Sequence, residues 1–272
     1  MTELVTIQQM LADMLKVFHD FCVEHSLTYY VVAGTALGAA RHKGFIPWDD
    51  DVDVGMPRPD YERFLMLFNK ENKNKRYILE SPETNDELYC YAYAKLYDTH
   101  TTLIEKIRNP LKRGLYLDIM PLDGAGNKEN DANKVIARIN YLVHILELKK
   151  SSPSKKRILV KRIILRLFYW SIDSFYSYRY LRNKINCLCK TFDWNESTYV
   201  TSYTCGTGKK NMMLKSVWGK PCLSQFEGIT VFCPEKNDVY LTHAYGNWKE
   251  YPPKDKQITH HNYYLDLEKP YK

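Results

Sequence analysis

The segment IPWDDDVDVGM, residues 46–56, is the most unusual part of this amino-acid sequence. It concentrates four aspartates within five positions: Asp49, Asp50, Asp51 and Asp53. In a strand over 51–56 the side chains would alternate between faces, which would put Asp49, Asp51 and Asp53 on one side. Two unit charges about 4 Å apart repel by roughly 1 kcal/mol in water and roughly 4 kcal/mol at an effective dielectric constant near 20. An acidic cluster is ordinarily a solvated loop, but the valines that alternate with these aspartates argue against one, so a divalent cation held by oxygen ligands is the more economical explanation.

The segments that flank this stretch predict a sheet with helices. Apolar residues at helical spacing from Leu4 to Phe21 predict a core-packing helix. Two further helices are expected, at 35–44 and at 59–69, the second led by a proline. Runs rich in β-branched and aromatic residues predict strands at 27–33, 51–56, 77–80, 89–97 and 115–120. The first 125 residues therefore look like a sheet domain that mixes strands and helices.

The pattern changes after this region. Helical, basic and aromatic-rich segments are predicted at 128–150 and 154–189, and turns dominate after residue 193. We therefore divide the chain into a catalytic core at 1–126, a basic helical region at 127–190 and a C-terminal region at 191–272 that completes the active site.

A third carboxylate is expected on a neighbouring strand. In GLYLDIMPLDG (114–124), Leu115, Leu117 and Ile119 alternate with polar or larger residues, which places Asp118 on one face of a short strand ending at Pro121. We interpret Asp123, in the LDG triplet, as a turn former. Two carboxylates with Mg²⁺ and a third from a neighbouring strand are typical of phosphoryl transfer.

Composition limits the remaining possibilities. The 272 residues are 44% hydrophobic and 26% charged, enough for a substantial core. A formal charge of +7 favours phosphate-bearing or anionic partners. Seven cysteines, an odd number, and an N-terminus without a basic start and apolar block predict free thiols in a reducing cytoplasm. The sequence has no run of about 18 uncharged apolar residues, so we expect no membrane span.

The order of these features resembles a known fold and a known family. A strand, Gly34-Thr35 at the start of a helix, a strand-borne Asp-x-Asp and a third aspartate together resemble the polymerase-beta type of nucleotidyltransferase fold. GTALGAARHKGFIPWDDDVDVGMPRPDYERF (34–64) is similar to the signature of the LicD family, the bacterial phosphocholine transferases related to fukutin and fukutin-related protein. LDIMPLDG, FEG and YGNWKEYPP, followed by a histidine pair at 260–261, resemble its later blocks. The resemblance implies an α+β fold: a mixed sheet with flanking helices, plus the helical, basic middle region.

The resemblance also assigns roles to individual residues. It implies that Asp51 and Asp53 bind Mg²⁺ or Mn²⁺, with Asp49 as a further ligand, and that Asp118 is either a metal ligand or a base toward the acceptor hydroxyl. The resemblance implies that the catalytic carboxylates are Asp51, Asp53 and Asp118. The remaining implied residues are substrate contacts. Gly34, Thr35 and Gly38 are expected to cradle the donor phosphates, and Arg41, His42 and Lys43 to contact the diphosphate. Trp48 is expected to pack on the nucleotide base or on the choline head group, and His260 to contact the substrate.

The implied reaction is transfer of phosphocholine from CDP-choline to a sugar hydroxyl of a cell-surface glycan precursor, such as lipopolysaccharide or teichoic acid, with release of CMP. Another CDP-alcohol, such as a ribitol phosphate donor, is an open alternative, and the acceptor could be a lipid-linked glycan. A nucleotide-sugar glycosyltransferase with a DxD motif is a weaker alternative, because Gly34-Thr35 and Asp118 are not part of that motif. A calcium-binding module would need a central loop glycine and a closing glutamate, and this sequence lacks them around the aspartates. We also expect no nucleic-acid partner.

The basic segment at 149–170 raises the question of a membrane contact. It mixes lysines and arginines with isoleucine, leucine and aromatic residues, as a membrane-surface helix does. No clean amphipathic face emerges at 100° per residue, so a packed helix with snorkelling cations is the competing interpretation. A peripheral location at the inner membrane face is thus a hypothesis to test.

Overall fold

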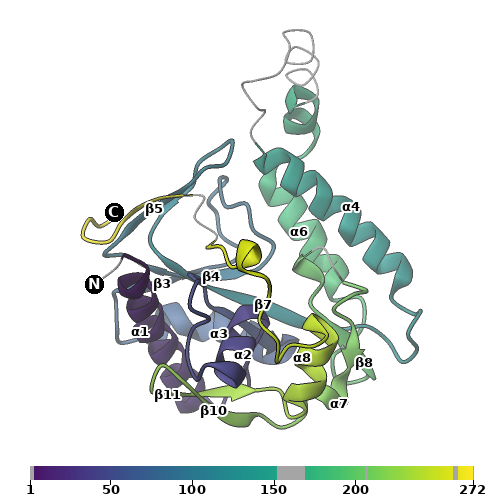
Figure 1. Ribbon diagram of the computed structural model, residues 1–272. Coiled ribbons are helices and arrows are strands. Elements are labelled where there is room, and N and C mark those ends of the chain that lie inside the picture. Colours follow the sequence, from purple (N-terminus) through teal and green to yellow (C-terminus); the bar gives the residue numbers. More distant parts are fainter. Residues whose placement is uncertain (1–2, 152–168, 206–207, 260–262, 272) are drawn as a thin grey trace.

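A computed structural model describes residues 3–151, 169–205, 208–259 and 263–271 of the chain (Figure 1). Its α-helices are α1 (Glu3–Glu24), α2 (Ala33–Arg41), α3 (Arg58–Glu71), α4 (Asn133–Lys150), α6 (Tyr178–Cys189), α7 (Lys215–Trp218) and α8 (Asn237–Tyr245). Residues 169–175 are also helical, and short 3-10 turns lie at Tyr203–Cys205 and Lys254–Lys256. The fold is thus of the mixed α+β kind that was expected.

Seven strands form the central mixed sheet. They are β1 (Tyr30–Val31), β2 (Asp53–Pro57), β3 (Tyr77–Glu80), β4 (Ala94–Asp98), β7 (Tyr116–Gly124), β8 (Tyr199–Thr201) and β9 (Met213–Leu214). The order is β1-β2-β7-β4-β3, and β8 joins the far part of β7 with β9 outside it. Only the β2–β7 pair is parallel; the other pairs are antiparallel. Sequence-distant strands therefore meet at β2 and β7, in the middle of the sheet.

The remaining strands form two small sheets. β12 (Tyr263–Asp266), β5 (Thr102–Glu105) and β6 (Lys112–Arg113) make one of them, and the hairpin of β10 (Cys222–Phe226) and β11 (Ile229–Cys233) makes the other. The hairpin turn contacts the end of α2, because Glu227 N–H donates to the Lys43 carbonyl. The hairpin thus connects the C-terminal part of the chain to the segment that follows α2.

The two faces of the central sheet differ in chemistry. Val54, Met56, Leu117 and Ile119 are fully buried in one core cluster with the apolar face of α1 and with α3. This is the expected alternation, since successive residues of a strand point to opposite faces. The other face carries polar side chains at the start of β2 and the middle of β7. It is the face on which the candidate site lies.

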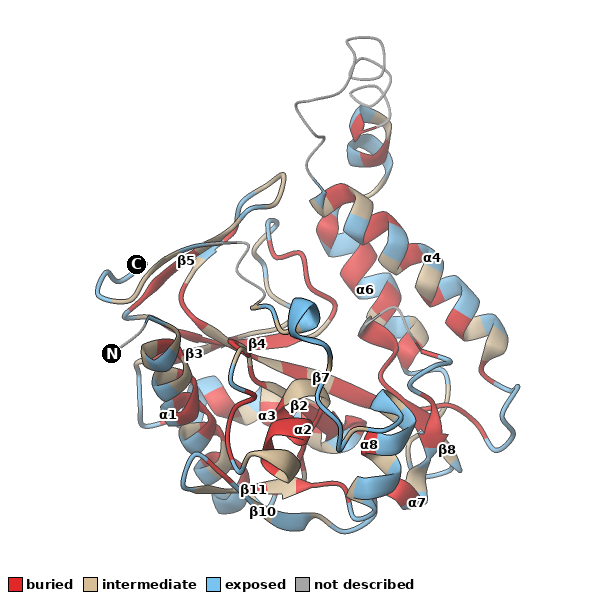
Figure 2. Cartoon of the chain, in the orientation of Figure 1, coloured by how far each residue is buried: buried red, intermediate tan, exposed pale blue. Residues whose placement is uncertain are grey.

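A second core lies under the helical part of the chain. α4 and α6 pack side by side and extend away from the sheet (Figure 1), and their buried and exposed residues alternate along each helix (Figure 2). No helix within the described ranges is long and apolar enough to cross a membrane. Most of the basic segment at 149–170, and with it the membrane hypothesis, lies outside the described residues.

The N-terminal helix, the strand at 77–80 and the helix after the proline are confirmed, whereas several predicted boundaries are wrong. β2 begins at Asp53 instead of 51, because the Asp49 N–H bonds the Ile46 carbonyl in a turn. The Asp53 N–H in turn donates to the Thr35 hydroxyl. Asp49 and Asp51 are therefore not part of a strand face. Five other predicted segments have different bounds in the structure. The predicted strands at 27–33, 89–97 and 115–120 are β1 (Tyr30–Val31), β4 (Ala94–Asp98) and β7 (Tyr116–Gly124). The predicted helices at 35–44 and 128–150 are α2 (Ala33–Arg41) and α4 (Asn133–Lys150).

The expectation for Asp123 is also wrong. β7 continues through Pro121, and Asp123 lies within the strand with 1% of its surface exposed. Its carboxylate accepts two hydrogen bonds from Arg58, at 2.6 Å from Nε and 3.0 Å from Nη2. Asp123 is thus half of a buried ion pair between α3 and β7, and not a turn residue.

Candidate active site

The site is built around two aspartates on neighbouring parallel strands. Asp53 of β2 and Asp118 of β7 are register partners. In-register residues of adjacent strands project to the same face, so the two carboxylates lie side by side. The backbone fixes them there, since the Asp118 N–H donates to the Val52 carbonyl at 2.9 Å and the Asp53 carbonyl accepts from Val32 N–H at 3.1 Å. The predicted third carboxylate is thus next to the Asp-x-Asp motif.

Asp49 reaches the same region from the preceding loop. The side chain of Gln8 donates to the Asp49 carbonyl at 2.9 Å, which anchors the loop to α1. A Cβ on Gly34 would lie 2.6 Å from Asp49 Oδ2, so only glycine leaves room for this carboxylate against α2. Gly34 therefore has a definite role in the structure, which is to let Asp49 pack against the first turn of the helix.

The carboxylates raise one another's pKa. Burial raises the pKa of Asp49 to about 8, with further contributions from Asp51 and Asp50. Burial also raises the pKa of Asp53 well above its usual value, together with the charges of Asp51, Asp118 and Asp49. For Asp118 burial is again the largest cause, and Lys95 opposes it. The cluster is thus an acidic site whose negative charge is only partly compensated by the protein.

The donor chemistry of this cluster fits a divalent cation. Carboxylate oxygens are the ligands that Mg²⁺ and Mn²⁺ prefer. Within the ranges that the structure describes, however, no group of three or more His, Cys, Asp or Glu side chains is arranged so that it could hold a metal ion. The type of ligand is therefore suitable, while the arrangement is not that of a closed ligand set.

The predicted donor-binding residues occupy two places. Thr35 is buried, and its hydroxyl oxygen accepts a hydrogen bond from the Asp53 N–H. Gly38 lies inside α2, where a Cβ would meet the Gly44 carbonyl at 2.4 Å, so it permits close packing of the loop that follows. Of the two, Thr35 is the one that the fold brings to the carboxylates.

The basic residues at the end of α2 contact the C-terminal segment. Arg41 Nη1 donates to the carbonyls of Trp248 and Glu250, both at 3.1 Å, and its guanidinium lies 4.5 Å from the centre of the Tyr251 ring. The Tyr251 hydroxyl is 3.1 Å from His42 Nε2, and burial together with Arg41 lowers the pKa of His42.

Trp48 lies near the same tyrosine, with ring centres 6.4 Å apart, whereas Lys43 is exposed. Arg41, His42 and Trp48 thus form one cluster with the segment 248–251. His260 lies outside the described residues.

Sequence reasoning missed Lys95. Its Nζ is 2.7 Å from Asp118 Oδ1, and only 1% of the residue is exposed. It is the register partner of Asp118 on β4. The signal available in the sequence was a single lysine in the aromatic run YCYAYAKLY (89–97), but no pattern tells which strand it will pair with.

A cavity of about 360 Å³ beside Asp53 was also missed. It continues the carboxylate face along β2 and β7, because Gly55, Met120 and Leu122 line it together with Asp53. Its other walls come from the C-terminal region. They are Ser202, Lys210, Asn211, Met213, Trp218, Tyr240, His243, Ala244 and Tyr245, with Val32 and Ala33 from the β1–α2 junction. The volume is within the range of small-molecule pockets, about 300–1,000 Å³.

Two hydrogen bonds hold the wall of this cavity. The Ala33 N–H donates to the Tyr240 hydroxyl at 2.9 Å, and His243 Nε2 is 2.7 Å from the Lys210 carbonyl. Ala33 has φ of 47°, a left-handed conformation that is uncommon for alanine and is often found at functional sites. The C-terminal region therefore closes the site over the point where β1 turns into α2.

Comparisons with known proteins connect this chain, with its mixed sheet and in-register aspartates, to a class of transferases. Residues 26–133 match the family described as LicD/FKTN/FKRP, nucleotidyltransferase domain. These residues include all of the site that lies on α2, β2, β4 and β7. The resemblance to the LicD family is therefore confirmed over this part of the chain, and the comparisons support a phosphotransferase.

Individual relatives agree with this assignment. A protein of Haemophilus influenzae, named lipopolysaccharide cholinephosphotransferase LicD, is 27% identical over 251 residues, which are 92% of each chain. An uncharacterized protein of Rickettsia typhi is 33% identical over 76 residues, 25% of each chain, and one of Rickettsia prowazekii is 40% identical over 50 residues, 18% of this chain and 19% of the other. The similarity to the Haemophilus influenzae protein thus extends through the regions that precede and follow the matched domain.

Proposed function

We propose that this chain transfers phosphocholine from CDP-choline to a sugar hydroxyl of a cell-surface glycan precursor and releases CMP. The observation that carries the proposal is the in-register pair Asp53 and Asp118 beside a cavity large enough for part of a small-molecule donor. Phosphoryl transfer depends on positioning and on charge compensation more than on covalent chemistry by the protein. The name of the Haemophilus influenzae relative supports choline phosphate as the transferred group and lipopolysaccharide as the acceptor.

The proposed metal role rests on ligand chemistry and on the resemblance to the family, since the described side chains are not arranged around an ion. Asp51 and Asp53, with Asp49, would hold Mg²⁺ or Mn²⁺, which when bound neutralises negative charge on the donor diphosphate. Gly34 and the start of α2 lie beside these carboxylates, where free helix amides favour an anion. Asp118 remains either a metal ligand or the base toward the acceptor hydroxyl.

The aromatic wall and one cation of the cavity suit the nucleotide. Trp218 and Tyr240, with ring centres 5.2 Å apart, offer apolar surface to a flat ring. Lys210, at the exposed side of the same wall, offers a positive charge to a phosphate. Substrate contacts are also proposed for the cluster of Arg41, His42 and Trp48 and for Lys43 and His260.

The experiment is product analysis by mass spectrometry with Mg²⁺ and a panel of CDP-alcohols, with and without a glycan acceptor. The test variant is Asp53→Asn, which keeps the size of the side chain and removes its charge. Asp13→Asn, at an exposed position of α1, is the matched control. Release of CMP from CDP-choline alone, lost in Asp53→Asn and kept in Asp13→Asn, is the expected result.

Other outcomes would redirect the proposal. Reaction with another CDP-alcohol, such as CDP-ribitol, would keep the site and replace phosphocholine by that group. Release of a free or transferred sugar from a nucleotide sugar would replace the proposal by a glycosyltransferase. Turnover that survives in Asp53→Asn would remove the carboxylate pair from the mechanism.

A further inference from the structure

A row of charged side chains crosses the central sheet. Asp53, Asp118, Lys95 and Glu80 are successive register partners on β2, β7, β4 and β3. Because in-register neighbours share a face, the four side chains line up on the carboxylate face. Glu80 is already compensated by Arg113, whose Nε is 2.9 Å from both of its oxygens. The charge of Lys95 is thus directed at Asp118.

Three tyrosines enclose the Lys95 ammonium. Nζ lies 3.4 Å from the ring centre of Tyr116, 4.1 Å from that of Tyr91 and 5.6 Å from that of Tyr93. A cation is attracted to aromatic faces, and more so when it is removed from water. These rings give the ammonium a fixed place, which an exposed lysine on a flexible stem would not have. The carboxylate that it holds is correspondingly fixed.

Both oxygens of Asp118 are engaged. Oδ1 contacts Lys95 Nζ at 2.7 Å, and Oδ2 accepts a hydrogen bond from the Tyr93 hydroxyl at 3.2 Å. A metal ion bound to Asp118 Oδ1 would therefore share that oxygen with the Lys95 ammonium, and the two positive charges would repel each other. Among the ion pairs of the described residues none involves Asp53, and Lys95 reaches it only as a more distant positive charge that lowers its pKa.

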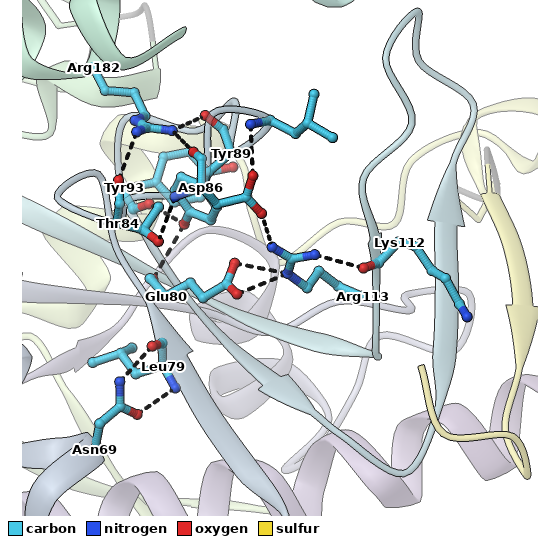
Figure 3. A network of polar contacts seen from close by, with 11 residues as sticks. Asn69, Leu79, Glu80, Thr84, Asp86, Tyr89, Tyr93, Lys112, Arg113 and Arg182 are labelled. Atoms are coloured by element: carbon cyan, nitrogen blue, oxygen red, sulfur yellow. Dashed lines mark hydrogen bonds and ion pairs between the residues drawn. The ribbon is translucent and has the colours of Figure 1, made fainter. Parts of the chain in front are cut away.

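The loop that supplies the tyrosines is itself anchored (Figure 3). The Tyr89 hydroxyl donates to the Tyr93 carbonyl at 2.7 Å, and Arg182 of α6 donates to the carbonyls of Thr84, Asp86 and Tyr89. The helical region thereby supports the loop that carries Tyr91 and Tyr93. Asp118 is thus contacted from β4, through Lys95, and from the loop that precedes β4, through Tyr93.

We propose that Lys95 is a positioning residue that holds Asp118 beside Asp53, and that its ammonium takes the place of a metal ion at Asp118. The inference rests on the proposed function, because it decides between the two roles left open there. Asp118 is then not a metal ligand, and it can act as the base toward the acceptor hydroxyl. Metal binding belongs to Asp53 and the aspartates that precede it.

The first test is Mn²⁺ binding by isothermal titration without substrate. Asp53→Asn is expected to weaken Mn²⁺ binding by at least about 10-fold, whereas Asp118→Asn leaves it close to that of the wild type. Lys95→Met combined with Asp118→Asn removes both charges and serves if the single variant does not fold. Equal losses of Mn²⁺ affinity in Asp53→Asn and Asp118→Asn would overturn the inference.

The second test is turnover of CDP-choline. Lys95→Met is expected to lower kcat by about 100-fold with little change in KM, because a carboxylate displaced by about 1 Å costs that much. Lys95→Met, Asp118→Asn and the double variant should have similar kcat, since residues that act as a unit are not additive. Tyr93→Phe should lower kcat, and Tyr180→Phe, at an exposed position of α6 away from Lys95, is the control. Losses that multiply in the double variant would overturn the inference.

A third readout separates this inference from the proposed function. The Lys95 ammonium, paired with Asp118 and enclosed by rings, should give a slowly exchanging ¹⁵N-coupled proton signal that is lost in Asp118→Asn. If neither Mn²⁺ binding nor turnover is found in the wild type, the proposed function fails and this signal alone decides for or against Lys95. Its absence from the wild type would refute the positioning role.

Discussion

Breaking the ion pair between Arg58 and Asp123 should destabilise the fold far more than breaking a surface pair. Arg58 is 8% exposed and Asp123 1%, with two hydrogen bonds between them, and Arg58 Nη1 also donates to Asn186 of α6 at 3.1 Å. Arg58→Met would leave the Asp123 charge buried without its partner, which costs about 3–5 kcal/mol. At about 2–4 °C per kcal/mol for chains of roughly this size, the melting temperature should fall by about 6–20 °C.

The assay is thermal unfolding at pH 7, followed by circular dichroism. Lys16→Met is the control, because its partner Asp20 is as exposed as Lys16 itself, at 58% and 56%, and such pairs contribute about 0–1 kcal/mol. Arg58→Met combined with Asp123→Leu replaces the pair by apolar groups and should recover much of the loss. A loss in Arg58→Met no larger than that in Lys16→Met would refute the reasoning.

The pH dependence of the same variant gives an independent check. Burial raises the pKa of Asp123, and Arg58 opposes that rise. Without Arg58 the folded-state pKa lies still higher above the unfolded value, so the variant gains protons on folding. Stability linked to such a group is present at low pH and is lost as the pH rises through the folded pKa. The difference in melting temperature between wild type and Arg58→Met should therefore be smaller at pH 5 than at pH 7, and a constant difference would contradict this account.

Three further variants test the packing around the site. Gly34→Ala should impair turnover more than stability, because its Cβ would lie 2.6 Å from Asp49 Oδ2; kcat and melting temperature measured together check this, and unchanged kcat would count against the placement of Asp49. Gly114→Ala should unfold or strongly destabilise the chain, since its Cβ would lie 1.7 Å from the backbone oxygen of Asp98, as soluble yield and melting will report. Arg182→Met should leave buried carbonyls unpaired and expose the 84–93 loop to faster hydrogen exchange, at about 1–3 kcal/mol for each carbonyl left without a partner; unchanged exchange would show that the loop does not depend on it.

Part of the site could be predicted because it is local in sequence. The strand alternation around Asp53 and Asp118 depends on neighbouring residues and predicts the face to which each carboxylate projects, whereas Asp51 lies before the strand. The resemblance of residues 34–64 to the LicD signature is likewise a property of contiguous residues. That resemblance is confirmed by the match over 26–133.

Other features depend on contacts between distant segments. Asp123 looked like a turn residue because the triplet LDG is typical of turns, yet its partner Arg58 is 65 residues away. Lys95 gave no motif, because its meaning comes from pairing with Asp118 on another strand. β2 begins at Asp53 because a turn precedes it, and the Asp53 N–H donates to the Thr35 hydroxyl, 18 residues earlier, which the sequence does not indicate.

Periodicity and motifs are set by residues a few positions apart, so the sequence was enough to predict a mixed α+β fold, the acidic cluster and the resemblance to the LicD family. Which side chains meet became visible in the folded chain: Asp53 beside Asp118, Lys95 among its tyrosines, and the C-terminal wall of the cavity against the start of α2. A side chain's charge state and role depend on burial and on partners within a few ångströms. Those partners are chosen by strand pairing and core packing across the whole chain, which no short stretch of sequence records.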